Sequence, residues 1–292
     1  YKPNDLYVVG ESYGGKYGPA LAHEIHKRNM GNPKHRMNLV GMILGDPSME
    51  PGIQMTGFGR LLFELGLADE NEVEKISAVE KRYVEAIQRK DFTKAFYIFD
   101  EMMGGDFQPY GSLYSNITSL PDYFNYMTPT YPILPFPIYL NLPSTRKALH
   151  VGNVDFWVLN STVEHYMIPD FMDTIAPFLI PIMDNYKVLI YSGQLDVILG
   201  PAGTERFLFQ LPWKGLQQYR SAQKQHWYLN NDDKANYVTG YVRQAHRFTQ
   251  VVLRRAGHMT ILDAPAECLD MLNRFIRDET WSMPPKSKKR AL

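Results

Sequence analysis

The sequence predicts an α/β fold with a central, mostly parallel sheet flanked by helices, and three observations support this prediction. An apolar, strand-like run at residues 6–9 is followed directly by the pentapeptide G-E-S-Y-G at residues 10–14. Two later strand-like runs, at residues 185–191 and 250–253, each lead into a loop that carries an acidic or a histidine side chain. Loops that follow parallel strands meet at one edge of the sheet, where α/β proteins bind their ligands.

The pentapeptide matches G-x-S-x-G, the pattern of a nucleophile elbow, in which a sharp strand-to-helix turn presents a serine at its tip. Gly10 and Gly14 are both expected to be required, because such a turn crowds the backbone and leaves little room for Cβ atoms. Ser12 is therefore the candidate nucleophile.

Two helices are predicted from apolar spacing. The first follows the elbow and closes before Gly31, and Pro19 fits it only within the first turn. Its expected apolar face repeats at i, i+4 and i+8: Tyr17, Leu21 and Ile25. The second begins near Pro265, and its expected face comprises Leu269, Leu272 and Ile276.

A serine hydroxyl needs a base and an acid partner to act as a nucleophile. In α/β-hydrolases these follow in the chain order Ser, Asp or Glu, His. Asp196 and His258 come after the two later strand-like runs and fit that order. His258 would take the proton of Ser12, and Asp196 would fix the imidazole tautomer. Asp46, after the apolar run at residues 39–44, is the rival acid; Asp196 is preferred because it lies one strand before the histidine.

Three segments together resemble the serine carboxypeptidases. Residues 10–17 resemble that family's G-E-S-Y-[AG]-G-x-Y, residues 191–196 its Y-x-G-[DQ]-x-D, and residues 257–265 its G-H-M-V-P-x-D-x-P. The similarity extends to about residue 281 and is closest to the vitellogenic-like carboxypeptidases, a lysosomal or secretory branch. The resemblance implies an α/β-hydrolase fold. It also implies hydrolysis of C-terminal peptide bonds through an acyl-enzyme on Ser12, best in acid, without cofactor or metal.

The same resemblance implies roles for residues beside the triad. The backbone N–H of Tyr13 would form half of an oxyanion hole, and Met259 is a candidate for lining the pocket. Glu11 would bind the substrate's C-terminal carboxylate, because a protonated carboxyl can donate a hydrogen bond where an ionised one would repel. The alternative for Glu11 is a buried polar residue that braces the elbow.

The sequence also departs from the family pattern. The second oxyanion glycine, and the Asn and second Glu of the carboxylate site, lie in and just beyond an N-G-G-P-G-x-S-S region that would precede residue 1. The first strands of the sheet are therefore expected to be missing. Residues 260–262 differ from the usual V-P-x. Cys268 is the only cysteine, so no internal disulfide is possible.

Composition limits the partners and the compartment. With 31 basic and 31 acidic residues, no nucleic acid or other polyanion is implied. No apolar run approaches the roughly 18 residues needed to span a membrane. Asn116 and Asn160 begin N-x-[ST] sequons, which beside the resemblance favour a glycosylated lysosomal or secreted protein. A peptide or protein with a free C-terminus is the implied partner, and the oligomeric state is not predicted.

The expected organisation is a hydrolase core interrupted by an insertion. Residues 1–50 and 185–281 form the core, residues 51–184 a largely helical cap, and residues 282–292 a disordered basic tail. Within the insertion, helices are predicted over residues 57–104 and 142–150. Two other functions remain open: a different acyl-transfer enzyme on the same fold, such as an esterase or acyltransferase, or a catalytically incompetent fragment.

Overall fold

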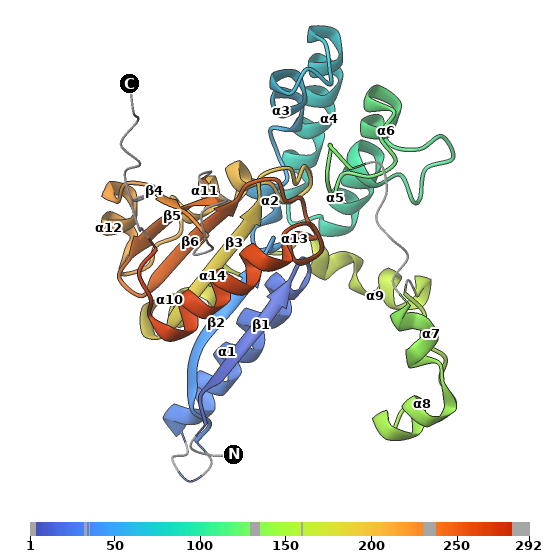
Figure 1. Ribbon diagram of the computed structural model, residues 1–292. Coiled ribbons are helices and arrows are strands. Elements are labelled where there is room, and N and C mark those ends of the chain that lie inside the picture. The colour runs from blue at the N-terminus through green and yellow to red at the C-terminus, as the bar shows by residue number, and fades with distance from the viewer. Residues whose placement is uncertain are drawn as a thin grey trace, which may run out of the picture.

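A six-stranded mixed sheet forms the centre of the computed structural model, which describes residues 4–31, 34, 36–128, 135–158, 160–229 and 238–281 (Figure 1). In these residues the strand order is β1-β2-β3-β6-β5-β4. The strands are β1 (Leu6–Glu11), β2 (Leu39–Gly45), β3 (Lys187–Gly193), β4 (Gln225–Trp227), β5 (Gly240–Ala245) and β6 (Phe248–Leu253).

Four strands are parallel, which confirms the predicted mostly parallel sheet. β1, β2, β3 and β6 run in one direction, with Ile43 opposite Leu189 and Leu189 opposite Thr249. β5 and β4 add an antiparallel extension to β6 that the sequence analysis did not predict. Because the four strands are parallel, the loops after β1, β3 and β6 come out at the same edge.

Helices cover both faces of the sheet. α1 (Gly14–Gly31), α10 (Ala176–Asn185), α11 (Pro201–Leu208) and α12 (Leu216–Ser221) pack on one face. α14 (Pro265–Arg277) packs on the other, after the short α13 (Thr260–Asp263). Side chains alternate between the two cores, as the pleat of a strand requires: Val188 belongs to the first core and Leu189 to the second.

The segment between β2 and α10 is helical and extends beyond the carboxyl ends of the strands (Figure 1). Its elements are α2 (Pro51–Gln54), α3 (Phe58–Glu64), α4 (Glu70–Gln88), α5 (Phe92–Phe99), the π-helix η2 (Asp100–Gly104), α6 (Leu113–Thr118), α7 (Phe136–Leu140), α8 (Pro143–Leu149) and α9 (Ser161–Phe171). These bounds confirm the helices predicted over residues 57–104 and 142–150. The longest, α4, begins with a capping box between Asp69 and Glu72.

The predicted apolar face of α1 is wrong. Tyr17 and Leu21 are 58% and 55% exposed, and Ile25 alone of the expected trio is buried. The buried face carries three small residues, Gly15, Gly18 and Ala22, together with Lys16, Pro19 and Ile25. Small side chains allow the helix axis to approach the strands closely, and a count of large apolar residues does not detect that. Pro19 is the sixth residue of α1 and lies in its second turn, not its first.

The predicted face of α14 is also wrong, by one residue. Of the predicted residues, Leu272 is half-buried against the core and Leu269 and Ile276 are exposed; the fully buried residues are Cys268, Met271, Arg274 and Phe275. Arg274 tolerates burial because its Nε donates to Asp270 Oδ2 at 2.6 Å and its Nη1 donates to the carbonyl of Thr280. A charged residue on the inner face shifted the apparent apolar stripe.

Two further expectations concern membrane-spanning segments and the C-terminal tail. Among the described residues, no helix is long and apolar enough to cross a membrane. The disordered tail predicted at residues 282–292 lies outside the described residues.

Candidate active site

Ser12, His258 and Asp196 meet at the carboxyl edge of the sheet. Ser12 directly follows β1, Asp196 follows β3 and His258 follows β6. His258 Nε2 lies 2.9 Å from Ser12 Oγ, and His258 Nδ1 lies 2.9 Å from Asp196 Oδ2. The three residues that the sequence analysis selected therefore form one continuous hydrogen-bonded chain. Asp196, not the rival Asp46, is the acid on His258 Nδ1.

Ser12 has a strained backbone conformation at the tip of the turn, and backbone hydrogen bonds hold it there. Ser12 has φ +57°, the left-handed region that non-glycine residues rarely occupy. Its N–H donates to the Gly45 carbonyl at 2.9 Å, and its carbonyl accepts from the N–H of Ser48 at 3.0 Å. The strained conformation is thus held by contacts to the loop after β2, as expected where strain serves a function.

The glycines that the turn requires differ in part from the expected pair. A Cβ on Gly10 would collide with the carbonyl oxygen of Gly14, as expected. A Cβ on Gly14 would meet nothing within 4 Å, so the expectation for this glycine is wrong. Gly15 is the second restricted position, because its Cβ would lie 2.6 Å from the Cβ of Pro47. Crowding arises where α1 passes the loop after β2, one residue later than the motif suggests.

The carboxylate of Asp196 is buried and receives two donors. Oδ2 faces His258, and Oδ1 accepts from the N–H of Leu199 at 3.1 Å. The loops that carry Asp196 and His258 touch directly, since a Cβ on Gly193 would collide with the carbonyl of Gly257. This close approach brings the acid and the base within hydrogen-bond distance.

A segment of the helical insertion that was not predicted from the sequence supports the histidine. The N–H of His258 donates to the Phe124 carbonyl at 2.6 Å, and the Phe124 ring stacks on the imidazole with centroids 5.1 Å apart. Asn125 Nδ2 donates to Asp263 Oδ2 at 2.9 Å, and the same oxygen accepts from the N–H of Gly257. The segment also reaches the Asp196 loop, because the N–H of Val197 donates to the carbonyl of Tyr123 at 3.1 Å. No motif in the sequence marks a backbone carbonyl as a support.

Burial and neighbouring charge shift the titration of the site. Burial lowers the pKa of His258, whereas the charge and hydrogen bond of Asp196 raise it, and the net pKa is above the usual value for histidine. Burial raises the pKa of Glu11, and the charge of His258 offsets part of this increase. Glu11 is the last residue of β1, half-buried, and directly precedes Ser12. Its carboxyl group therefore holds its proton to a higher pH than a free glutamate.

Tyr13 connects the elbow to the insertion. Its hydroxyl donates to Asp170 Oδ2, and its ring stacks on Phe171 with centroids 5.5 Å apart. Its backbone lies between Ser12 and the first residue of α1, where the N–H groups of a helix start favour negative charge. This position suits the predicted oxyanion donor.

The remaining predicted residues lie at accessible positions. Met259 follows His258 and is half-buried at the start of α13. Asn116 is exposed in α6. Asn160 is exposed and caps α9, its Oδ1 accepting from the N–H groups of Thr162 and Val163 at 3.1 Å.

The only grouping of potential metal ligands found in the described part of the chain overlaps the triad. Asp46, Asp196 and His258 offer ligand atoms within 4.8 Å of one another. Both ring nitrogens of His258 already face Ser12 and Asp196. A cation bound there would break the hydrogen-bonded chain, so the arrangement fits nucleophilic chemistry better than metal binding.

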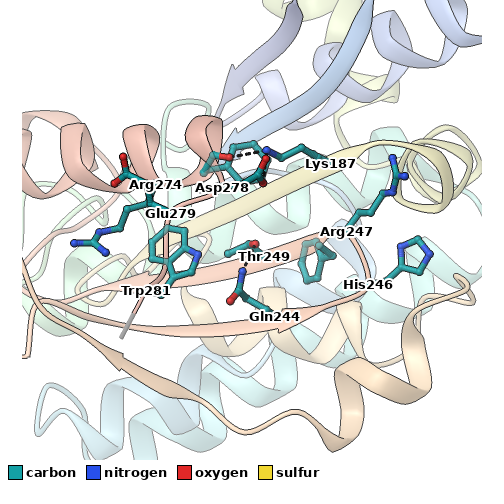
Figure 2. Close-up of a pocket in the computed structure, with 11 residues that line it drawn as sticks. Lys187, Gln244, His246, Arg247, Thr249, Arg274, Asp278, Glu279 and Trp281 are labelled. Atoms are coloured by element: carbon teal, nitrogen blue, oxygen red, sulfur yellow. Dashed lines mark hydrogen bonds and ion pairs between the residues drawn. The ribbon is translucent and has the colours of Figure 1, made fainter. Parts of the chain in front are cut away.

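Two cavities differ in their relation to the triad. One of about 210 Å³ reaches Asp196 and is otherwise lined mainly by α3 and α11. Another of about 340 Å³ lies at the amino ends of β3 and β6, the opposite end of the sheet from the triad. Figure 2 shows its charged lining, including the ion pair of Lys187 with Asp278 at 2.6 Å. This second cavity is too far along the strands to take part in chemistry at Ser12.

Comparison with known proteins yields a consistent set of relatives. A family model described as Serine carboxypeptidase matches residues 1–278. The chain is 40% identical over 283 residues to the Probable serine carboxypeptidase CPVL of Homo sapiens, covering 96% of this chain and 59% of that protein. It is 37% identical over 279 residues to the Venom serine carboxypeptidase of Apis mellifera, covering 94% and 58%. The chain thus spans less than two thirds of the length of these curated relatives.

A solved structure supports the fold. The prohormone-processing carboxypeptidase Kex1 of Saccharomyces cerevisiae superposes with a TM-score of 0.70 at 17% identity, covering 94% of this chain and 62% of that one. At this identity the likeness establishes the α/β-hydrolase fold. The family match over residues 1–278, together with the two relatives, shows that the chain belongs to the serine carboxypeptidase family.

Proposed function

We propose that this protein is a serine carboxypeptidase that hydrolyses C-terminal peptide bonds through an acyl-enzyme on Ser12. The observation that carries the proposal is the hydrogen-bonded chain from Ser12 through His258 to Asp196, with both steps at 2.9 Å. The family membership supports the choice of a peptide with a free C-terminus as substrate.

The geometry supports a sequence of proton transfers. His258 Nε2 takes the proton of Ser12 Oγ as the oxygen attacks the scissile carbonyl, and the backbone N–H of Tyr13 donates to the developing oxyanion. His258 then gives the proton to the nitrogen of the departing amino acid, and Ser12 retains the acyl group. Water releases it by the same relay in reverse. Asp196 stabilises the imidazolium in both halves of the reaction.

Glu11 supplies the preference for a free C-terminus. Its raised pKa keeps the carboxyl protonated at a pH where a peptide's C-terminal carboxylate is already ionised. The protonated Glu11 donates a hydrogen bond to that carboxylate, and Met259 lines the pocket beside His258. An acidic working pH follows from this requirement.

The proposal also covers the compartment of the protein and its domain organisation. The sequons at Asn116 and Asn160 are exposed, and one relative is by name a venom protein. These features support a glycosylated protein of the lysosome or the secretory pathway. Residues 51–184 act as a cap, since the segment at Tyr123 and Phe124 reaches over both catalytic loops.

Release of the C-terminal residue from a blocked dipeptide is the direct test of the proposed function. We expect hydrolysis of the free acid at acidic pH to be at least about 100-fold faster than that of the matching C-terminal amide, because only the acid presents a carboxylate to Glu11. Equal rates would instead favour an esterase or acyltransferase on this fold. Absence of hydrolysis, together with no labelling of Ser12 by a serine-reactive phosphonate, would identify a catalytically incompetent chain.

Glu11→Gln is expected to flatten the pH dependence of KM. In the unmodified protein, the KM for the free acid should rise as the pH passes upward through the raised pKa of Glu11, because the ionised carboxylate repels the substrate. This rise begins above the ordinary glutamate range of about 4.3. Glutamine cannot ionise, so its KM should stay level over that interval while kcat still follows His258.

The control for Glu11 is an amide or ester substrate, whose KM should depend little on pH in either protein. If Glu11 only braces the elbow, Glu11→Gln should change kcat and stability and leave the pH dependence of KM as it was.

A further inference from the structure

Asp46 is a buried acid that the proposed relay does not use. It follows β2 directly and is 0% exposed. Its backbone has φ +41°, and its N–H donates to the carbonyl of Tyr191 at 2.8 Å. Its side-chain Oδ1 accepts from the N–H of Gly193 at 2.8 Å. Two backbone contacts to β3 therefore fix the direction in which this carboxyl group points.

The other oxygen of this carboxyl group lacks a conventional donor. Among the described residues, none donates a hydrogen bond to Asp46 Oδ2, and the atom is closed to solvent. The Asp46 and Asp196 carboxyl groups are neighbours in the cluster that also contains His258, where one ligand atom from each residue lies within 4.8 Å of the others. Two carboxylates in such contact repel each other, and an unpaired buried charge is costly. A proton between them removes both problems.

The groups facing Asp46 from the surrounding elements leave no counter-charge for it. Glu11 on β1 is an acid, and Tyr191 on β3 and Cys268 on α14 are neutral, since burial raises the pKa of the Cys268 thiol to about 12 and that of Tyr191 above its usual value. Of the described residues near Asp46, His258 is the one that can become cationic, and its Nδ1 is already bonded to Asp196. One imidazolium cannot neutralise both aspartates.

We propose that Asp46 is a neutral carboxylic acid whose Oδ2–H donates a hydrogen bond to the Asp196 carboxylate, which makes Asp46 a positioning residue for the Asp196–His258 pair. Burial, followed by the charge of Asp196, raises the pKa of Asp46 well above its ordinary value, in agreement with this geometry. Asp196 then receives three donors, from Leu199, His258 and Asp46.

The catalytic consequence rests on the proposed function of the triad. Donors on a carboxylate favour its charged form, so three of them hold Asp196 ionised and fixed in orientation. A neutral Asp46 also adds no negative charge beside His258, whose pKa is already raised. The imidazole can therefore lose its proton, and act as a base, at a lower pH than it could beside two charged aspartates.

The test that needs no activity is the pH dependence of thermal unfolding. A carboxyl whose folded pKa is raised binds more protons in the folded than in the unfolded state, so the contribution of Asp46 to the stability of the unmodified protein falls as pH rises above about 3.9. Asp46→Asn donates from the same place without titrating. Its melting temperature, relative to the unmodified protein, should therefore gain about 3 °C or more between pH 4 and pH 7.

Asp69→Asn is the matched control, because asparagine also caps helices well and Asp69 is exposed at the start of α4. The melting temperature of Asp69→Asn, minus that of the unmodified protein, should not rise between pH 4 and pH 7. The proposal would be overturned if the melting temperature of Asp46→Asn, minus that of the unmodified protein, stayed constant with pH or decreased as pH rises.

A second readout separates positioning from simple packing. Asp46→Ala should slow phosphonate labelling of Ser12 about tenfold or more, because it removes the donor to Asp196 and leaves the N–H of Gly193 without its acceptor. Asp46→Asn should recover most of that loss and extend labelling to higher pH. Equal losses in both variants would overturn the proposal. If the unmodified protein is not labelled at all, the proposed function fails, and the unfolding experiment still decides the state of Asp46.

Discussion

His258→Ala should slow phosphonate labelling of Ser12 and hydrolysis of a blocked dipeptide by about 10⁴–10⁶-fold, the range seen when a catalytic base is removed from a serine protease. Without the imidazole, the proton of Ser12 Oγ has no acceptor at 2.9 Å, and the leaving amine has no donor. The rates should be measured under pseudo-first-order conditions at the pH where the unmodified protein reacts fastest.

The control is another histidine of the same chain. His165 is exposed on α9, and His165→Ala should label at the rate of the unmodified protein. The fold of His258→Ala should be verified by circular dichroism, because the histidine is buried against Phe124. A folded His258→Ala protein that is labelled at a normal rate would exclude His258 as the base.

Gly10→Ala should destabilise the protein by about 2–3 kcal/mol, whereas Gly14→Ala should be neutral or stabilising by up to about 1 kcal/mol. At Gly10 the added methyl collides with backbone, the carbonyl of Gly14, which cannot swing aside. At Gly14 the methyl enters open space at the first residue of α1, and the backbone has no positive φ. Alanine also restricts the unfolded chain more than glycine does.

Urea unfolding at constant pH measures both free energies, and the two variants differ only in which glycine of the motif is changed. The motif alone predicts equal damage at the two positions. Comparable losses for Gly10→Ala and Gly14→Ala would mean that the turn is crowded on both sides, contrary to the contacts around Gly14.

The parts of the site that were predictable are those with a local signature. The strand before Ser12 and the glycine before it mark the elbow, and the loops with Asp196 and His258 each follow an apolar run. Asp46 and Asp196 both lie between Ser12 and His258 in the chain, so it is the position of Asp196 one predicted strand before the histidine that distinguishes them, and the bond to His258 Nδ1 agrees. In such cases a few neighbouring residues determine the geometry.

The parts that were not predictable depend on tertiary partners. The inner faces of α1 and α14 contain Gly15 and Arg274, whose burial is explained by the sheet and by Asp270 and not by their own polarity. β4 and β5 carry polar residues, and they form through tertiary pairing, β5 with β6 and β4 with β5. Phe124 supports His258 with its carbonyl and ring from 134 positions away in the sequence, which no spacing rule detects.

The two partners of the bond between Ser12 and His258 are 246 positions apart in the sequence. At a synthesis rate of about 5–20 residues per second, the serine leaves the ribosome on the order of ten seconds or more before the histidine does. During that interval the elbow can form against the end of β2 and the loop that follows it, but the hydroxyl has no base. The hydroxyl of Ser12 therefore gains its hydrogen-bond partner only when β6, which leads to His258, has joined β3 in the sheet.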